Sequence, residues 1–271
     1  EIRIKVMMNT TKTTAMTTEQ IQAKAPAVLT QEASSRVSKH YIHIPTTELI
    51  SDMKKLGWYV ADVDQQQSGE KSKAAFAKHM VIFRNNDIKM TDGANDTVYP
   101  QILISNSHNG MGAFKFNAGL FRVVCANGLV VSTEDFGSLR IKHRGYSFEE
   151  LQTTVMKMVE ELPATVEVLN KFKAVELTEE QKIEFALEAL GVRFGGEEAI
   201  MEPKLLLQPK READAGNSLW AVYNVVQENM IQGGFEYKTP KGRNKTARPI
   251  TAFNRDIEVN KKLYALAEAF A

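Results

Sequence analysis

The densest group of chemically useful side chains is a basic cluster late in the chain. It lies in a segment without acidic residues, directly after the aromatic pair Phe235 and Tyr237. Its members are Lys238, Lys241, Arg243, Lys245 and Arg248. Lys and Arg neutralise phosphates, and aromatic rings stack on bases. The pattern therefore predicts nucleic-acid contacts through these seven residues.

The backbone of this segment predicts a loop. Pro240, Gly242 and Pro249 disfavour regular strand pairing, and five cations within eleven residues repel one another unless an anion is present. We therefore expect the segment from Lys238 to Arg248 to be mobile and to become ordered on binding. The alternative is a solvated loop, because a run of charge needs no function to be stable on a surface.

A second basic group precedes Tyr146 and repeats the combination of cations with an aromatic ring. It contains Arg140, Lys142 and Arg144, with His143 among them. These three cations are further candidates for phosphate contacts. Solvated surface charge is again the alternative.

His108 stands among the short polar side chains Asn106, Ser107 and Asn109. Such a group at the end of a strand can contact a phosphate or carry a proton, so His108 joins the nucleic-acid-binding candidates. The alternative is a hairpin turn, because Asn and Gly tolerate positive φ.

Other chemistries find little support. Cys125 lies inside an apolar run, where a lone cysteine is usually a small buried hydrophobe, so a thiol site with Asn127 and His143 is not expected. His40 and His43 would face opposite sides of a strand, which argues against a metal site. The sequence has no glycine-rich phosphate loop of the Walker type. We expect neither a cofactor nor a bound metal.

The composition sets the wider limits. The 271 residues are 43% hydrophobic, enough for a substantial core, and 34 basic against 33 acidic residues give a net charge of +1. Attraction to phosphates must therefore come from local clusters. One cysteine, no apolar run near the length of a membrane span and no secretion signal lead us to expect a soluble cytoplasmic protein.

The element pattern predicts an α+β fold. Residues 1–38 are rich in Thr, Gln, Ala and Ser and are expected to be a flexible segment, followed by a single α+β domain over residues 39–271. A helix is expected over 46–57, capped by Thr46 or Thr47 and ended by Gly57. Strand-like runs separated by turn residues then predict antiparallel hairpins as far as residue 132.

The second half is predicted to be helical. Helices are expected over 147–177, 178–191, 217–232 and 254–270. Ser147 with Glu150, and Thr178 with Gln181, have the spacing of capping boxes, and Gly191 is expected to end the second helix. Residues at helical spacing are expected to line the core: Leu219, Trp220, Tyr223, Val226 and Met230.

Three segments resemble a known family. The first runs Asn106, Ser107, His108, Gly110; the second runs Leu120, Phe121, Arg122, Val124, Cys125, Asn127, Gly128, Leu129; the third is the stretch Leu219, Trp220, Asn224, Gln227, Glu228, Asn229. These segments are similar to the phage/plasmid-like domain-of-unknown-function family DUF932, over roughly residues 40–270. Tyr264 departs from the pattern at a position associated with Trp. The resemblance implies a cytosolic α+β protein of mobile genetic elements in a bacterial host cell, and no defined activity.

These observations together favour a single-stranded nucleic-acid binder. The element order resembles that of strand-annealing recombination proteins of the RecT and Redβ kind, which implies a basic groove and a homo-oligomer. The alternative is a phage protein-interaction factor without catalysis, such as a host-defence inhibitor or an assembly factor. An enzyme with a site centred on His108 ranks third.

Overall fold

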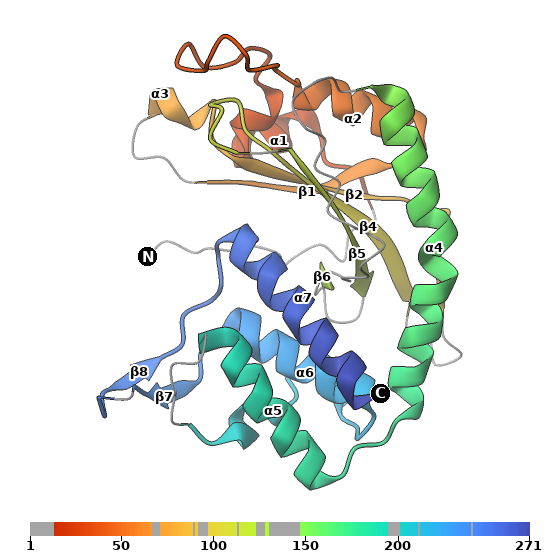
Figure 1. Ribbon diagram of the computed structural model, residues 1–271, viewed down its shortest axis with the longest axis vertical. Helices are drawn as coiled ribbons and strands as arrows, with labels where there is room; N and C mark the ends of the chain where they lie inside the picture. The colour runs from red at the N-terminus through yellow and green to blue at the C-terminus, as the bar shows by residue number, and fades with distance from the viewer. Residues whose placement is uncertain are drawn as a thin grey trace. The chain divides into compact units, whose positions relative to one another are not determined.

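A computed structural model of the chain describes residues 14–66, 71–88, 90–91, 97–112, 114–122, 128–129, 147–194, 201–210, 212–239 and 241–271. Cys125 and the second basic group of Arg140, Lys142 and Arg144 lie outside the described residues. The chain forms two compact units, Glu1–Leu162 and Pro163–Ala271. Figure 1 shows the helices and strands of both units.

The first unit is built on an antiparallel sheet. Its strands are β1 (Tyr59–Gln65), β2 (His79–Arg84), β3 (Met90–Thr91), β4 (Thr97–Asn106), β5 (Lys115–Arg122) and β6 (Gly128–Leu129). Their order is β1-β2-β4-β5-β6, with β3 beside β4. Every pairing is antiparallel, and the short helix α3 (Lys71–Ala74) separates β1 from β2. The expectation of an antiparallel β-rich middle is confirmed.

Helices cover one face of this sheet. They are α1 (Thr18–Lys24), the 3₁₀ helix η1 (Pro26–Leu29) and α2 (Thr46–Lys55), as Figure 1 shows. Their apolar side chains share one core with Val81 and Phe83 of β2 and with Ile102 and Ile104 of β4. Residues two apart on a strand face the same side, so alternation along β2 and β4 builds this core.

Helix α2 confirms its expected end and corrects its expected start. Gly57, at φ +84°, follows its last turn, as a terminating glycine should. Pro45 rather than Thr46 or Thr47 occupies the N-cap, without a side-chain cap. The hydroxyl of Thr46 is buried and contacts His79 instead.

Residues 14–38 are folded, which differs from the flexible segment expected over residues 1–38. Thr17 and Gln20 form a capping box at the start of α1. Ile21 and Val28 are buried in the core of the first unit. The expectation rested on the mostly polar composition of the segment. Its few apolar residues are nevertheless buried, and their burial stabilises it.

Helix α4 (Phe148–Ala174) is one long helix whose residues belong to both units. The Ser147 hydroxyl accepts a 3.1 Å hydrogen bond from the amide of Glu150, so the expected cap is confirmed. Val155 and Met158 lie in the core of the first unit, and Phe172 is buried in the second.

The second unit confirms the helical C-terminal half. Its further elements are α5 (Glu179–Phe194), η2 (Pro203–Leu207), η3 (Glu212–Asp214), α6 (Leu219–Gln232), the strands β7 (Glu236–Lys238) and β8 (Asn244–Thr246), and α7 (Phe253–Phe270). Thr178 and Gln181 form the expected capping box of α5. That helix continues past Gly191 to Phe194, so the expected stop was wrong.

Helix α6 is buried around almost its whole circumference. The predicted apolar stripe is buried, and Trp220 stacks on Tyr223 at 6.0 Å between ring centroids. The polar residues between them are buried as well, and their amides are hydrogen-bonded. The Asn229 side chain donates to the carbonyls of Leu206 and Gln208, and the Gln227 side chain donates to Asn260 of α7.

The apolar residues at the end of α7 are used within the second unit. Leu263 and Tyr264 are buried, and Phe270 packs edge-on against Phe185 at 5.3 Å. These side chains pack within a single chain, and the homo-oligomer expected from the resemblance to annealing proteins stays a prediction. Among the described residues, no helix combines the length and apolarity that a membrane crossing requires.

Candidate nucleic-acid interface

The predicted basic loop contains a short antiparallel hairpin. Strands β7 and β8 pair with Tyr237 opposite Lys245. The amide of Thr239 donates to the Arg243 carbonyl at 2.9 Å, and Gly242, at φ +74°, closes the turn. The expectation that Pro and Gly would prevent pairing was wrong, because Gly242 supplies a turn conformation that suits a tight hairpin.

Glycines join this hairpin to the end of α6. Gly233 has φ +66°, and a Cβ placed on it would lie 2.5 Å from the carbonyl oxygen of Ala247. The Gly234 amide donates to that same carbonyl at 2.8 Å, and the Ala247 amide donates to Phe235 at 2.9 Å. The close approach of the two chain segments therefore requires glycine at position 233.

Arg193, in the last turn of α5, lies against the base of the hairpin. Its guanidinium donates to the carbonyl of Met230 in α6 and, at 2.5 Å, to the carbonyl of Arg248 after β8. It also lies over the rings of Phe194 and Phe235, 5.7 and 5.5 Å from their centroids. The guanidinium therefore makes two kinds of contact: hydrogen bonds from its nitrogens to carbonyl oxygens, and cation–π contacts with aromatic rings.

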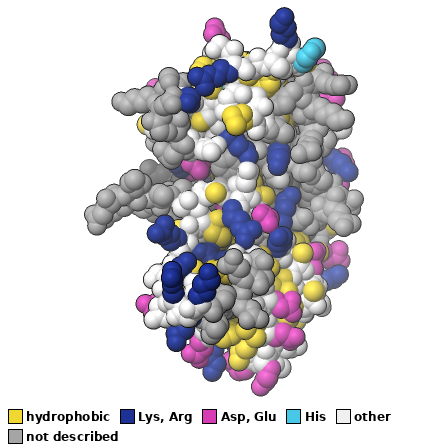
Figure 2. All heavy atoms as spheres, turned by 60° about the vertical axis from the view of Figure 1, so that its left-hand side comes forward, with side chains coloured by type: hydrophobic (Ala, Val, Ile, Leu, Met, Phe, Trp, Pro, Cys, Tyr) yellow, Lys and Arg dark blue, Asp and Glu magenta, His cyan; other side chains and the backbone are white. Residues whose placement is uncertain are grey.

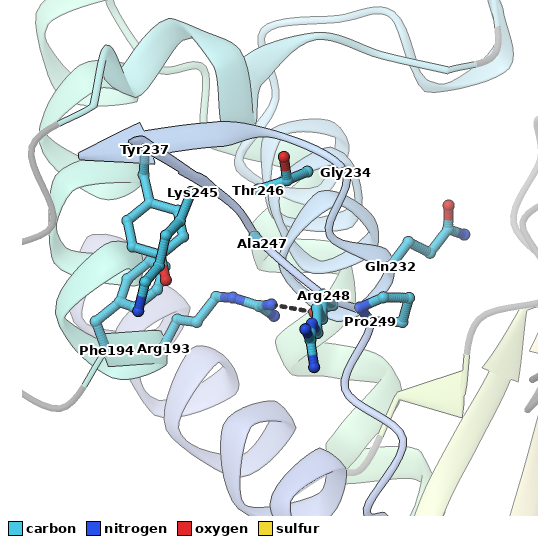
Figure 3. A pocket seen from close by; sticks show the side chains of 10 residues that line it. All are labelled: Arg193, Phe194, Gln232, Gly234, Tyr237, Lys245, Thr246, Ala247, Arg248 and Pro249. Atoms are coloured by element: carbon cyan, nitrogen blue, oxygen red, sulfur yellow. Dashed lines mark hydrogen bonds between the residues drawn. The ribbon is translucent and has the colours of Figure 1, made fainter. Parts of the chain in front are cut away.

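An open pocket of about 1010 Å³ lies between the hairpin and the end of α5 (Figure 3). We call it the hairpin groove. Its described lining consists of Arg193, Phe194, Gln232, Gly234, Tyr237, Lys245, Thr246, Ala247, Arg248 and Pro249. The half-buried rings of Phe194 and Tyr237 contact each other at 4.7 Å between centroids. The groove thus combines cations with a partly exposed aromatic surface, which suits an anion attached to a planar ring.

The five predicted cations all lie on the surface. Lys245 and Arg248 line the hairpin groove, whereas Lys238, Lys241 and Arg243 are exposed elsewhere on the hairpin and its turn. Within the described part of the chain, none of the five forms an ion pair. Figure 2 shows Lys and Arg side chains distributed over the face that it presents, with acidic side chains among them.

The two predicted aromatic residues have different roles. Tyr237 is half-buried and lines the groove, so its ring can meet a ligand. Phe235 is only 9% exposed and packs under the guanidinium of Arg193. A base cannot stack on a ring that is covered in this way, so the structure assigns Phe235 to the support of the hairpin.

His108 lies inside the first unit and is fully buried. Its ring packs against those of His43 and His79, with centroids 4.6 and 4.8 Å away. With no exposed atom it cannot contact a phosphate, so its inclusion among the nucleic-acid-binding residues was wrong. The turn interpretation of this segment fits better, because Gly110 has φ +72° and Asn109 accepts a hydrogen bond from the amide of Met111.

Burial keeps this histidine cluster neutral. Desolvation lowers the pKa of His79 to about 4 and that of His108 to about 3, where the charges of the neighbouring imidazoles add to the effect. The Nδ1 of His79 lies 2.9 Å from the Ala77 carbonyl, which can only accept, so Nδ1 carries the proton. Neither ring nitrogen of His43 or His108 has a hydrogen-bond partner of good geometry among the described residues. The backbones of Gln31 and Ala27 lie close enough to raise the pKa of His43 and of His108 slightly, against the larger effect of burial.

Arg193, Phe194 and Gln232 line the groove but were not predicted from the sequence. The expected stop at Gly191 excluded the first two from helix α5, and they lie more than forty residues before the basic segment. The pair of a cation and an aromatic residue at 193 and 194 was the available signal. No group of three His, Cys, Asp or Glu side chains within the described ranges is placed to hold a metal ion.

Comparisons with known proteins agree with the resemblance. The chain is 27% identical to the UPF0380 protein YafZ of Escherichia coli (strain K12) over 254 residues, which are 94% of this chain and 91% of that protein. It is 26% identical to the UPF0380 protein YfjQ of the same organism over 253 residues, 93% of this chain and 90% of that protein. No solved structure matches. The model of the family described as "Domain of unknown function (DUF932)" matches residues 33–264, and the chain belongs to this family.

Proposed function

We propose that this chain binds single-stranded nucleic acid through the hairpin groove. The observation that carries the proposal is the placement of Lys245 and Arg248 beside the partly exposed ring of Tyr237 in one open pocket. The cations would neutralise phosphates, and Tyr237 would stack on a base. A base is free to stack in this way only when it is not already stacked within a duplex.

The lining of the groove favours binding over chemistry. Its described residues include no carboxylate, imidazole or thiol. Proton transfer usually employs His, Asp or Glu, and nucleophilic catalysis usually needs a base beside the nucleophile. A basic and aromatic surface without these groups is typical of a site that holds a strand.

The exposed cations outside the groove extend the same surface. Lys238, Lys241 and Arg243 lie on the hairpin and its turn, which would let neighbouring phosphates of one strand contact several of them. Such contacts carry no base preference. The protein would therefore bind many sequences with similar affinity, as a strand-annealing recombination protein must.

The test is fluorescence anisotropy with a labelled oligothymidylate of about 20 nucleotides at several salt concentrations. The Lys245→Ala/Arg248→Ala variant is expected to bind more weakly, and its slope of log K against log salt should become shallower by about 0.7 for each lost contact. Lys171→Ala removes one exposed cation from α4 and is the matched control. Absence of wild-type binding at low salt would refute the proposal.

Tyr237 tests the stacking contribution separately. Tyr237→Ala is expected to lose about 1–3 kcal/mol of binding free energy, whereas Tyr237→Phe keeps the ring and most of the affinity. Both variants should retain the wild-type salt slope, because neither changes a phosphate contact. Equal binding by all three proteins would show that the ring does not stack on a base.

Strand annealing would also involve several copies of the chain. Light scattering with and without the oligonucleotide measures the mass in solution. A homo-oligomer is expected at least in the bound state. A monomer mass under both conditions would leave a simple single-strand binder.

A further inference from the structure

The hairpin is joined to the end of α6 through two successive glycines. Gly233 and Gly234, both at positive φ, are the residues that follow α6. Gly234 is exposed, and a Cβ on it would meet nothing within 4 Å. Because two successive glycines restrict the backbone very little, the orientation of the hairpin must be fixed by other contacts.

Arg193 supplies contacts on both sides of this connection. Met230, whose carbonyl accepts from the guanidinium, lies in α6 before the glycines. Arg248, whose carbonyl also accepts, follows the second strand (Figure 3). One planar group therefore joins the segment that enters the hairpin to the segment that leaves it. The ring of Phe235 beneath the same guanidinium adds a third contact, at the start of β7.

The backbone that carries Arg193 is itself held in place. Arg255 of α7 donates from one guanidinium nitrogen to the carbonyls of Val192 and Arg193, at 3.3 and 2.7 Å. These are among the last carbonyls of α5, which have no partner within the helix. These hydrogen bonds fix the backbone at the end of α5, from which the Arg193 side chain extends.

We infer that Arg193 is a positioning residue for the hairpin groove, which fixes the hairpin against α5 and α6 without neutralising a phosphate. The inference rests on the proposed function. Its donors are directed at two backbone carbonyls, whereas the side chains of Lys245 and Arg248 are exposed and form no ion pair among the described residues. A groove fixed before the ligand arrives costs less ordering on binding, so Arg193 raises affinity indirectly.

Two readouts distinguish positioning from direct contact. Arg193→Lys keeps the charge but loses the planar fork that reaches both carbonyls. We expect about tenfold weaker binding of the oligothymidylate, with an unchanged salt slope. In the protein without ligand, the amides of Gly234 and Ala247 should exchange with deuterium about tenfold faster, because their bonds close the base of the hairpin.

Lys245→Ala is the matched control. It should give a salt slope shallower by about 0.7 and leave the exchange of both amides unchanged. Arg193→Gln serves as a neutral second variant, and its circular dichroism shows whether the fold is kept. If Arg193→Gln unfolds, the affinity, salt slope and amide exchange of Arg193→Lys, compared with those of the wild type, test the inference.

Two results would overturn the inference. Wild-type affinity and exchange in Arg193→Lys would mean that the guanidinium does not hold the hairpin. A shallower salt slope in that variant would make Arg193 a phosphate contact. If the wild-type protein does not bind the oligonucleotide, the proposed function fails, but the exchange measurement without ligand still tests whether Arg193 holds the hairpin.

Discussion

At the scale of single residues, the histidine cluster makes the first unit sensitive to acid. His79 is neutral when folded because burial lowers its pKa from 6.5 to about 4. The unfolded chain takes up this proton near pH 6.5 and the folded chain only near pH 4, so stability is lost as pH falls through that range. Asp256 of the second unit acts in the opposite direction, so the Asp256→Asn variant is used to measure this effect. Urea unfolding of that variant should show at least about 2 kcal/mol less stability at pH 5 than at pH 7.5.

His108→Phe tests the same cluster. Phenylalanine keeps an aromatic ring of similar size and removes two nitrogens that lack hydrogen-bond partners among the described residues. The variant should be at least as stable as the wild type at pH 7.5 and lose less stability at pH 5. An unchanged acid dependence would show that His108 does not take part in it.

Asp256 in the second unit has the opposite effect. Burial raises its pKa from 3.8 to about 7, although its carboxyl accepts a 2.8 Å hydrogen bond from Asn260. The folded chain retains this proton where the unfolded chain has lost it, so stability falls as pH rises from about 4 to 7.

Asp256→Asn removes this proton and keeps an oxygen that can accept from Asn260. At pH 8 it should raise the free energy of unfolding by roughly 2–4 kcal/mol, and at pH 4 it should change little. Urea titrations at the two pH values measure the difference. Equal effects at both values would mean that the ionisation of Asp256 is not the cause.

At the scale of elements, two glycines of the second unit should respond oppositely to the same change. Gly191 lies inside α5, exposed, with nothing within 4 Å of an added Cβ. Gly191→Ala should stabilise the protein by about 0.5–1 kcal/mol. Gly233→Ala should destabilise it by more, because the Cβ would meet the Ala247 carbonyl at 2.5 Å and the backbone has φ +66°. Thermal unfolding of the two variants provides the comparison.

Gly191 also shows why part of the site could not be predicted. Local signals identified the α+β class, the antiparallel strands and the caps at Ser147 and Thr178, because each depends on neighbours in sequence. The end of α5 instead depends on Arg255, more than sixty residues away, which donates to its last carbonyls. No local pattern reveals such a partner, so Phe194 and Arg193 were not placed beside the predicted cluster.

The groove residues of the hairpin could be predicted only in part from the sequence. The composition identified Lys245, Arg248 and Tyr237, which line the groove. It could not distinguish Tyr237 from Phe235, because both are aromatic and only the packing around Arg193 buries one of them. His108 was misplaced for a related reason: a polar turn at a strand end does not reveal whether its side chain points inward.

At the scale of the whole molecule, the chain offers one tryptophan in each unit. Trp58 lies in the core of the first and Trp220 in that of the second. Helix α4 contributes Met158 to the first core and Phe172 to the second, so we expect the two units to unfold together as a single domain. Urea unfolding of Trp58→Phe and Trp220→Phe, each followed through the remaining tryptophan and by circular dichroism, tests this. In each variant both signals should share one midpoint, whereas separate midpoints would indicate two domains.

The burial of α6 on almost every side has a consequence for how its sequence can vary. In a saturation mutagenesis library, α5 should show tolerated positions that recur every three to four residues, because one of its faces is exposed. Helix α6 should show no such periodicity of tolerated positions. Its apolar positions reject polar residues, and its Asn and Gln positions reject apolar ones, since each replacement would leave a buried carbonyl or amide unpaired. In the mutagenesis data, almost every position from Trp220 to Met230 should therefore reject most substitutions.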